Sequence, residues 1–457
     1  MRRRLLAGLV AATLALAFTP AARAQDSHYW FDQFGNRALL LSGAVVGDPA
    51  DLSSVYYNPG GLSLVEQTEL LLAGLVISIG NTTLEEAVGP GTDLGQRVFD
   101  IAPSLIAGEI PMEGSKHRFA YSVLKRQSSE FRSGAQVDLT GDEFEVPTVE
   151  LLGNAVRVDA KLSEYWMGGT WSYPVRPSLG VGVSTFIAVR SQRRFAGNTV
   201  QILSTDNRAA VGNVATDYDY WNWRVLWKLG VQGKFSDWDM GVTVTTPSLN
   251  LFGSGKVGNN LTLVGQAVNE NGDPLTEIAN NFQTGLGATY KSPLSVAFGA
   301  GRSFGPTSLH LSLEYFARLS AYTVVDAQPF TGQTSGLDYD PKIVEELDDV
   351  VNLGVGVERV FSDDVLGYFG FHTDFNAAST NPRANLSLTK WDFYHVSGGA
   401  TLNAAGTSFT LGGNLALASD QIVIDQGDPF APIGVPPELQ ASSYKLTVLL
   451  GFSFLAR

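Results

Sequence analysis

The segment that most constrains the fold of this chain lies near its C-terminus. Large apolar side chains occupy every second position there, at Tyr444, Leu446, Val448, Leu450, Phe452 and Phe454. Successive side chains of a β-strand point to opposite faces, so this spacing predicts a strand with one apolar face. The same alternation recurs at 179–190, 221–232, 308–319 and 408–417. Because a sheet that faces lipid must close on itself to satisfy its backbone groups, we expect an all-β fold, a transmembrane antiparallel β-barrel.

The N-terminal residues predict export. Arginines at positions 2–4 precede an apolar stretch from Leu5 to Phe18, and Ala22-Arg23-Ala24 has the form of a cleavage site. A basic start, a short apolar stretch and such a site are typical of a secretory signal peptide. We therefore expect residues 1–24 to be a cleaved signal peptide and the exported barrel to lie in a bacterial outer membrane.

Composition excludes several classes of function. The formal net charge is −14 at pH 7, so nucleic acid is not expected as a partner. The chain has no cysteine, which excludes disulfides, thiolate metal sites and a cysteine nucleophile. The five histidines show no short metal-binding spacing, and no Gly-x-Ser-x-Gly sequence occurs. We expect no cofactor, no metal and no catalytic residue.

The connections between alternating segments differ in length. Short turns are expected near 112–115, 174–177, 235–237, 305–307, 362–364 and 404–406. Polar stretches at 81–97, 136–157, 191–219, 259–280, 325–348, 377–391 and 421–440 are interpreted as long loops. Short turns at one end and long loops at the other are typical of outer-membrane barrels. If Lys291-Ser292-Pro293 is a bulge within one strand, where proline is tolerated, the pattern predicts about fourteen strands.

Residues 25–67 precede the first expected strand and do not alternate. They are rich in glycine, aspartate and small apolar residues. A barrel of this width leaves a lumen that wall side chains alone do not fill. We therefore expect residues 25–67 to fold inside as a plug, called the hatch below, and residues 68–457 to form the barrel.

The hatch contains the residues that carry a family resemblance. Residues 43–62 read GAVVGDPADLSSVYYNPGGL, and Asn58, Pro59, Gly60 and Gly61 form the motif within them. This stretch resembles the hatch of the FadL/TodX-type transport proteins of outer membranes, in which alanine is usual at the position of Gly60. Stretches 241–247, 293–299 and 352–359 are also similar to that family. The resemblance implies passive, ligand-gated uptake of long-chain fatty acids or hydrocarbons, with lateral exit through the barrel wall.

The resemblance also gives the expected mature N-terminus a role. Tyr29, Trp30 and Phe31 stand together there. In the family this end reaches into an apolar pocket and shifts when ligand binds, so these three residues are candidate ligand contacts. The alternative is that they only pack the hatch against the wall.

The third expected strand breaks its own pattern. Phe119, Tyr121 and Val123 share one face, but Lys125 continues that row and is followed by Arg126 and Gln127. A lysine facing lipid at mid-membrane is costly. Either Lys125 lies at the interface and extends its ammonium group to water, or the strand bends inward. The resemblance implies a kink in this strand that opens the wall, so residues 125–127 are the candidate wall-opening segment.

Two other functions stay open at this stage. A polar-solute porin would suit a lumen lined by Arg224, Lys228, Glu314 and Arg318, although a plug would not suit it. A membrane-embedded hydrolase would need a serine and a histidine at one level of the barrel. The expected partners are a hydrophobic small-molecule ligand, outer-membrane lipid and the barrel assembly machinery, and the expected state is a monomer.

Overall fold

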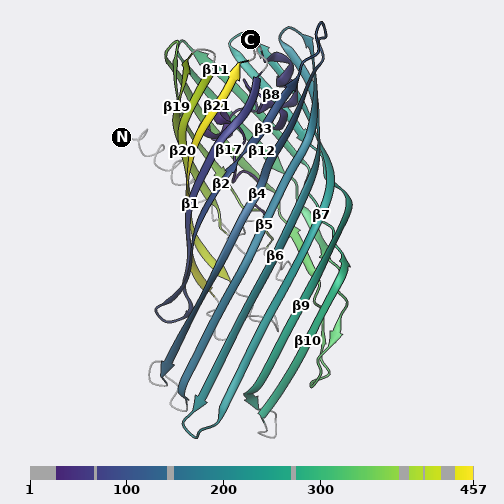
Figure 1. Cartoon of the computed structure of the whole chain (residues 1–457), viewed down its shortest axis with the longest axis vertical. Coiled ribbons are helices and arrows are strands. Elements are labelled where there is room, and N and C mark those ends of the chain that lie inside the picture. The colour runs from purple at the N-terminus through teal and green to yellow at the C-terminus, as the bar shows by residue number, and fades with distance from the viewer. Residues whose placement is uncertain are drawn as a thin grey trace, which may run out of the picture.

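The computed structural model describes residues 27–65, 69–140, 149–268, 274–379, 391–404, 407–423 and 438–455. The expected signal peptide lies outside these residues. Among them, seventeen strands form one antiparallel sheet. The first strand, β1 (Glu69–Gly89), pairs with the last, β21 (Glu438–Leu455), and this pairing joins the two ends of the sheet into a barrel (Figure 1).

The other strands of the barrel sheet follow in chain order. They are β2 (Thr92–Pro103), β3 (Leu105–Ile110), β4 (Arg118–Thr140), β5 (Val149–Arg176), β6 (Leu179–Ser204), β7 (Ala209–Phe235), β8 (Trp238–Thr245), β9 (Leu249–Val268), β10 (Pro274–Gly287), β11 (Ser295–Phe304), β12 (Thr307–Phe316), β17 (Val350–Ser362), β18 (Val365–Asp374), β19 (Phe393–Ala404) and β20 (Thr407–Val423). Between β12 and β17, two small sheets pair β13 (Leu319–Val325) with β16 (Ile343–Leu347) and β14 (Phe330–Thr331) with β15 (Asp338–Tyr339).

Three strands of the barrel are interrupted. β2 and β3 both pair with β1, and β8 and β9 both pair with β7. β10 pairs with β9 and β11 with β8, so the expected bulge at 291–293 is instead a full break between β10 and β11. Counting each interrupted strand once reduces seventeen to fourteen among the described residues. The number depends on how breaks are counted, so the exact strand count stays a prediction.

Most of the stretches interpreted as long loops are strand. β5, β6 and β7 run for 28, 26 and 27 residues. β1 and β2 are separated by only two residues, and β6 continues to Ser204. The loop interpretation of 81–97, 191–219 and 259–280 was therefore wrong for most of their length. These strands continue past the apolar part of the wall, where polar residues occupy the outer face as well, so the apolar alternation ends before the strand does.

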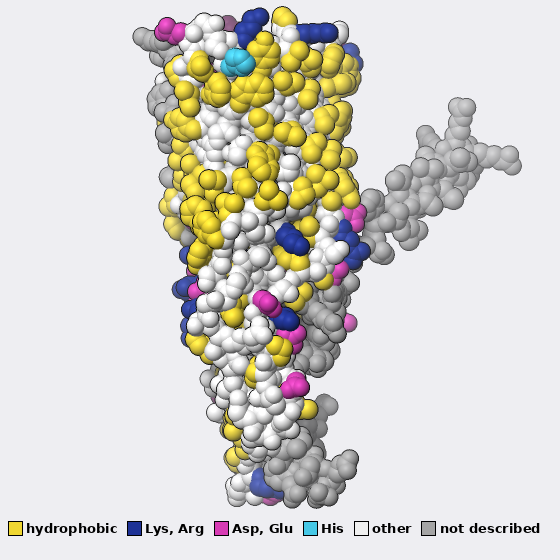
Figure 2. All heavy atoms as spheres, turned by 90° about the vertical axis from the view of Figure 1, so that its right-hand side faces the viewer, with side chains coloured by type: hydrophobic (Ala, Val, Ile, Leu, Met, Phe, Trp, Pro, Cys, Tyr) yellow, Lys and Arg dark blue, Asp and Glu magenta, His cyan; other side chains and the backbone are white. Residues whose placement is uncertain are grey.

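The outer wall carries a belt of apolar side chains. In Figure 2 the belt covers the half of the barrel nearer the short turns, and the other half is mainly polar. On β12, Leu311 and Leu313 are each 39% exposed whereas Ser312 is fully buried. The facing predicted from alternation is confirmed on this strand.

The residues before β1 lie against the inner wall. They include helices α2 (Asn36–Leu40) and α3 (Ser54–Tyr57) and the 3₁₀ helix η2 (Pro59–Leu64), near the short-turn end of the barrel (Figure 1). Val55 and Leu62 are fully buried, in one cluster with the inward side chains Phe186 and Leu226. In the described part of the chain, no helix has the length and apolar character needed to cross a membrane.

Candidate functional site

Asn58 joins the hatch motif to the wall. Its side-chain Nδ2 donates to the carbonyl oxygens of Val231 (3.0 Å) and Val46 (3.1 Å) and to Gln232 Oε1 (3.2 Å), and its Oδ1 accepts from the Gly60 N–H. Pro59 follows as the first residue of η2, where its missing N–H costs nothing. The motif thus has a defined structural role at the inner face of β7.

Glycines on the wall make room for this motif. A Cβ on Gly182 would lie 2.3 Å from the Pro59 oxygen, and a Cβ on Gly180 would lie 2.2 Å from the Gly60 oxygen. From the other side, a Cβ on Gly60 itself would lie 2.8 Å from the carbonyl oxygens of Gly180 and Gly230. This close approach explains glycine at a position where the resembled family usually has alanine. We call Gly180, Gly182 and Gly230 the glycine seat.

The three N-terminal aromatic residues reach a different part of the wall. The Tyr29 ring stacks on Phe316 at 4.1 Å between centroids, and the Trp30 Nε1–H donates to Glu314 (2.8 Å). Phe31 packs edge-on against Phe393 and lies under the Lys445 ammonium group. All three therefore pack between hatch and wall, and Phe31 also lines the cavity described below.

The candidate wall-opening segment contains a bulge. β4 and β5 change register between Lys125 and Gln127, so Arg126 is the extra residue and points inward, 6% exposed. Arg126 Nη2 donates to the backbone carbonyl oxygen of Tyr29 (2.9 Å), and Gln127 Nε2 donates to the backbone carbonyl oxygen of His28 (2.7 Å). The structure thus brings this segment together with the N-terminal residues and keeps both apart from the Asn58 motif.

At this bulge the wall separates. β3 pairs with β4 only as far as Leu124, and β2 pairs with β1 but not with β4. Three sets of contacts bridge the separated strands further along, one of them the Ser133 hydroxyl donating to the Gly95 carbonyl oxygen (2.8 Å). Lys125 Nζ meets Asp100 Oδ2, and the Gln96 side-chain amide donates to the Glu130 oxygen while accepting from the Arg132 N–H. We call the separation between these bridged strands the window.

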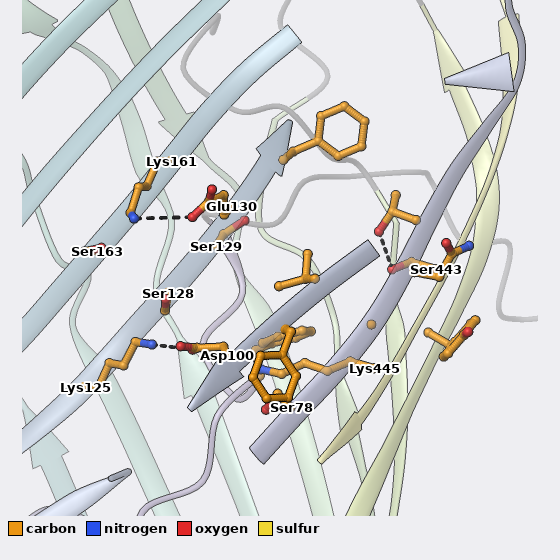
Figure 3. Close-up of a pocket in the computed structure, with 18 of the residues that line it drawn as sticks. Ser78, Asp100, Lys125, Ser128, Ser129, Glu130, Lys161, Ser163, Ser443 and Lys445 are labelled. Atoms are coloured by element: carbon orange, nitrogen blue, oxygen red, sulfur yellow. Dashed lines mark hydrogen bonds and ion pairs between the residues drawn. The ribbon is translucent and has the colours of Figure 1, made fainter. Parts of the chain in front are cut away.

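A cavity of about 260 Å³ fills the window. Figure 3 shows Ser128, Ser129 and Lys125 on one side of it and Ser78, Ser443 and Lys445 on the other. Phe31 lies at its inner end and the exposed side chain of Phe99 at its outer wall. Lys445 forms an ion pair with Asp32 at 3.0 Å, so the N-terminal segment contributes to this lining. The cavity therefore reaches from Phe31 of the N-terminal segment to Phe99 on the exposed outer face.

A second cavity, of about 40 Å³, lies deeper, beside Tyr29 and Arg126. Glu164 at its edge accepts from Arg190 (3.0 Å), Arg224 (2.5 Å) and the Trp166 Nε1–H (2.6 Å). Sequence reasoning placed Arg224, Lys228 and Glu314 in the lumen, and all three are buried there, but Arg318 lies outside the barrel sheet and is exposed. Glu164 and Tyr290 were missed, because the arginines that they contact are 26 to 100 residues away in sequence.

Three solved structures share this architecture over nearly the whole chain. A Pseudomonas aeruginosa FadL homologue matches with a TM-score of 0.57 and 12% identity, over 95% of this chain and 99% of its own. The toluene transporter TodX of P. putida matches at 0.56 and 12%, over 93% and 99%. The chain has the FadL/TodX fold. The monoaromatic hydrocarbon channel CymD matches at 0.54 and 12%, over 93% and 98%.

At 12% identity these matches show the fold of the chain and not the ligand that it binds. The antiparallel barrel fold expected from the resemblance is confirmed. No family model matches the sequence, and no curated protein matches it. The described residues also contain no group of three or more histidine, aspartate or glutamate side chains placed to hold a metal ion.

Proposed function

We propose that this protein takes up hydrophobic small molecules, long-chain fatty acids or hydrocarbons, across a bacterial outer membrane by passive, ligand-gated transport. The ligand enters the barrel and leaves sideways through the window. The observation that carries the proposal is the separation of β2 from β4, which have no ladder pairing with each other, beside the apolar belt. A solute that leaves there reaches lipid without crossing water.

The N-terminal segment is the proposed gate. Arg126 and Gln127, on the strand that borders the window, bind the backbone oxygens of Tyr29 and His28. Lys445, on β21 at the opposite side of the cavity, binds Asp32. A ligand that displaces residues 28–32 would therefore change contacts on both sides of the cavity. The proposal includes cleavage of the signal peptide, insertion into the outer membrane by the barrel assembly machinery, and a hatch formed by residues 25–67. The barrel would act as a monomer surrounded by outer-membrane lipid.

Uptake of a labelled long-chain fatty acid and of toluene by proteoliposomes tests the proposal. We expect uptake of at least one of them above that of empty liposomes, with no swelling in isosmotic sugar solution. Swelling in sugars would favour the polar-solute porin. Hydrolysis of a long-chain ester by the pure protein would favour the hydrolase, although the structures with this fold are transporters and channels.

Removing residues 25–67 gives a second test. If they fill the lumen, the shortened barrel should still show heat-modifiable migration and should now pass small sugars. Unchanged permeability in a folded barrel would show that the assignment of the hatch is wrong.

A further inference from the structure

Four cationic side chains converge inside the barrel. Arg126, Arg190, Arg224 and Lys228 project inward from β4, β6 and β7, and none is more than 6% exposed. Glu164 binds two of them, and Glu314 accepts from Trp30 and Ser295. Among the described residues, Arg190 and Arg224 each form an ion pair with Glu164, whereas Arg126 and Lys228 have no carboxylate within ion-pair distance. A buried cation without a directly paired carboxylate is disfavoured, so an anion bound here would stabilise the group.

Two guanidinium nitrogens in this group mark where the anion would bind. Arg224 Nη1 and Arg126 Nε are buried and have no hydrogen-bond partner among the described residues. Both residues line the 40 Å³ cavity, as does Lys228, whose ammonium lies 4.2 Å from the centroid of the Tyr56 ring. A buried donor without a partner loses its hydration and gains nothing in return. A carboxylate that entered this cavity could accept from both arginines.

An aromatic ring already occupies the other half of this site. The guanidinium carbons of Arg190 and Arg224 lie 3.8 and 4.8 Å from the centroid of the Tyr290 ring, within the range of cation–π attraction. Tyr290 belongs to the break at 288–294, where no strand is assigned. Its backbone N–H is held by the Asn250 side chain rather than by a neighbouring strand. Its ring can therefore move without disrupting a row of sheet hydrogen bonds.

We propose that this site binds flat aromatic carboxylates and that Tyr290 is its internal competitor. The ring of the ligand would take the place of the Tyr290 ring against the two arginines, and its carboxylate would accept from Arg224 and Arg126. The existing cavity holds only a few waters, so Tyr290 must leave for a ring to enter. The inference rests on the proposed function only in that the ligand reaches the site through the barrel.

Calorimetric titration in an uncharged detergent tests the inference with four probes. Benzoate carries both ring and charge, toluene only the ring, cyclohexanecarboxylate only the charge, and decanoate a charge on a long chain. In Tyr290→Ala, benzoate should bind about tenfold or more tightly than in the unchanged protein, because the competitor is gone. Benzoate should also bind that variant about tenfold more tightly than toluene or cyclohexanecarboxylate.

Variants that change one charge complete the test. Adding Arg224→Gln to Tyr290→Ala should weaken benzoate at least tenfold and toluene much less, because toluene loses only a cation–π contact whereas benzoate also loses a donor to its carboxylate. The matched control is Arg157→Gln, because the Arg157 side chain is exposed and lies over Phe195, away from the site. Arg157→Gln should change the affinity for neither benzoate nor toluene. Heat-modifiable migration shows which variants remain folded barrels.

Three outcomes would overturn the inference. They are equal affinity for benzoate and cyclohexanecarboxylate, tighter binding of decanoate than of benzoate, and no benzoate binding by folded Tyr290→Ala. Fatty-acid and toluene uptake by the same preparations separates this from the proposed function. If fatty-acid or toluene uptake is intact but benzoate does not bind, only the proposed aromatic-acid site is rejected. If neither fatty acid nor toluene is taken up, the proposed transport function is rejected.

Discussion

Lys125 on β4 and Asp100 on β2 form an ion pair, with 2.5 Å between Nζ and Oδ2, just beyond the point where β4 stops pairing with β3. The pair spans the window. The Lys125 side chain is 13% exposed and that of Asp100 45%. An ion pair this accessible contributes at most about 1 kcal/mol. It can therefore hold the window borders together and still be opened by a passing ligand.

Removing this pair should accelerate exit. In Lys125→Gln, we expect fatty-acid uptake by proteoliposomes to rise up to about fivefold, the rate equivalent of about 1 kcal/mol, with barrel stability unchanged. The control is Lys256→Gln, which breaks a similar exposed pair with Asp219 on the wall formed by β7 and β9. A rise of equal size in the control would mean that the window is not the exit.

The glycine seat should be sensitive to a single methyl group. Gly182→Ala places a Cβ against the Pro59 carbonyl, and overpacking of this kind costs about 1–3 kcal/mol. We expect faster hydrogen exchange of residues 54–64. Gly169→Ala is the control, because a Cβ there meets only one atom, at 3.9 Å, and lies on the exposed face. Equal protection in both variants would show that the hatch motif does not rest on the seat.

Leu313 and Ser312 should respond differently to substitution. Leu313→Arg puts a charge on the lipid face and should cost about 2–4 kcal/mol near mid-bilayer. Ser312→Ala removes only the hydroxyl that accepts from the Val46 N–H, about 1 kcal/mol. Reversible unfolding in urea with lipid vesicles measures both. Equal losses would mean that the facing of β12 is wrong.

Acid should loosen the hatch at Asp48. Burial alone would raise the pKa of this carboxyl, but Arg37, His310 and Lys234 outweigh burial and hold its pKa below the ordinary value. A lowered pKa stabilises the folded form above the ordinary pKa, about 4, and this stabilisation disappears as pH falls through the folded value. Cleavage of the hatch by pepsin, normalised to an unfolded peptide, should therefore rise below about pH 4.

Asp48→Asn is the matched variant for the acid prediction. It lacks the titrating group, so its hatch should be cleaved faster than the unchanged one at pH 5 and should show a smaller increase below pH 4. An equal increase in hatch cleavage below pH 4 in both proteins would show that carboxylates other than Asp48 cause it.

Local alternation was enough to predict the barrel and the facing of residues such as Leu313. It could not predict the length of β5 to β7, because polar residues on both faces leave no periodic signal. It located the irregularity at Lys125 and left two explanations open. The bulge turns Arg126 inward while Lys125 stays in the outward row opposite Tyr165. Glu164, Arg190 and Arg224 meet because β5, β6 and β7 pair side by side, and Tyr290 joins them from the break between β10 and β11. No local pattern encodes either arrangement.

The central claim is that hydrophobic ligands leave through the window, and crosslinking tests it most directly. The chain has no cysteine, so Asp100→Cys with Lys125→Cys can be joined specifically by a short, reducible bis-thiol reagent. We predict that the crosslinked protein still binds a labelled fatty acid but no longer delivers it to the liposome membrane, and that reduction restores delivery. Unchanged delivery by a fully crosslinked sample would contradict lateral exit through the window.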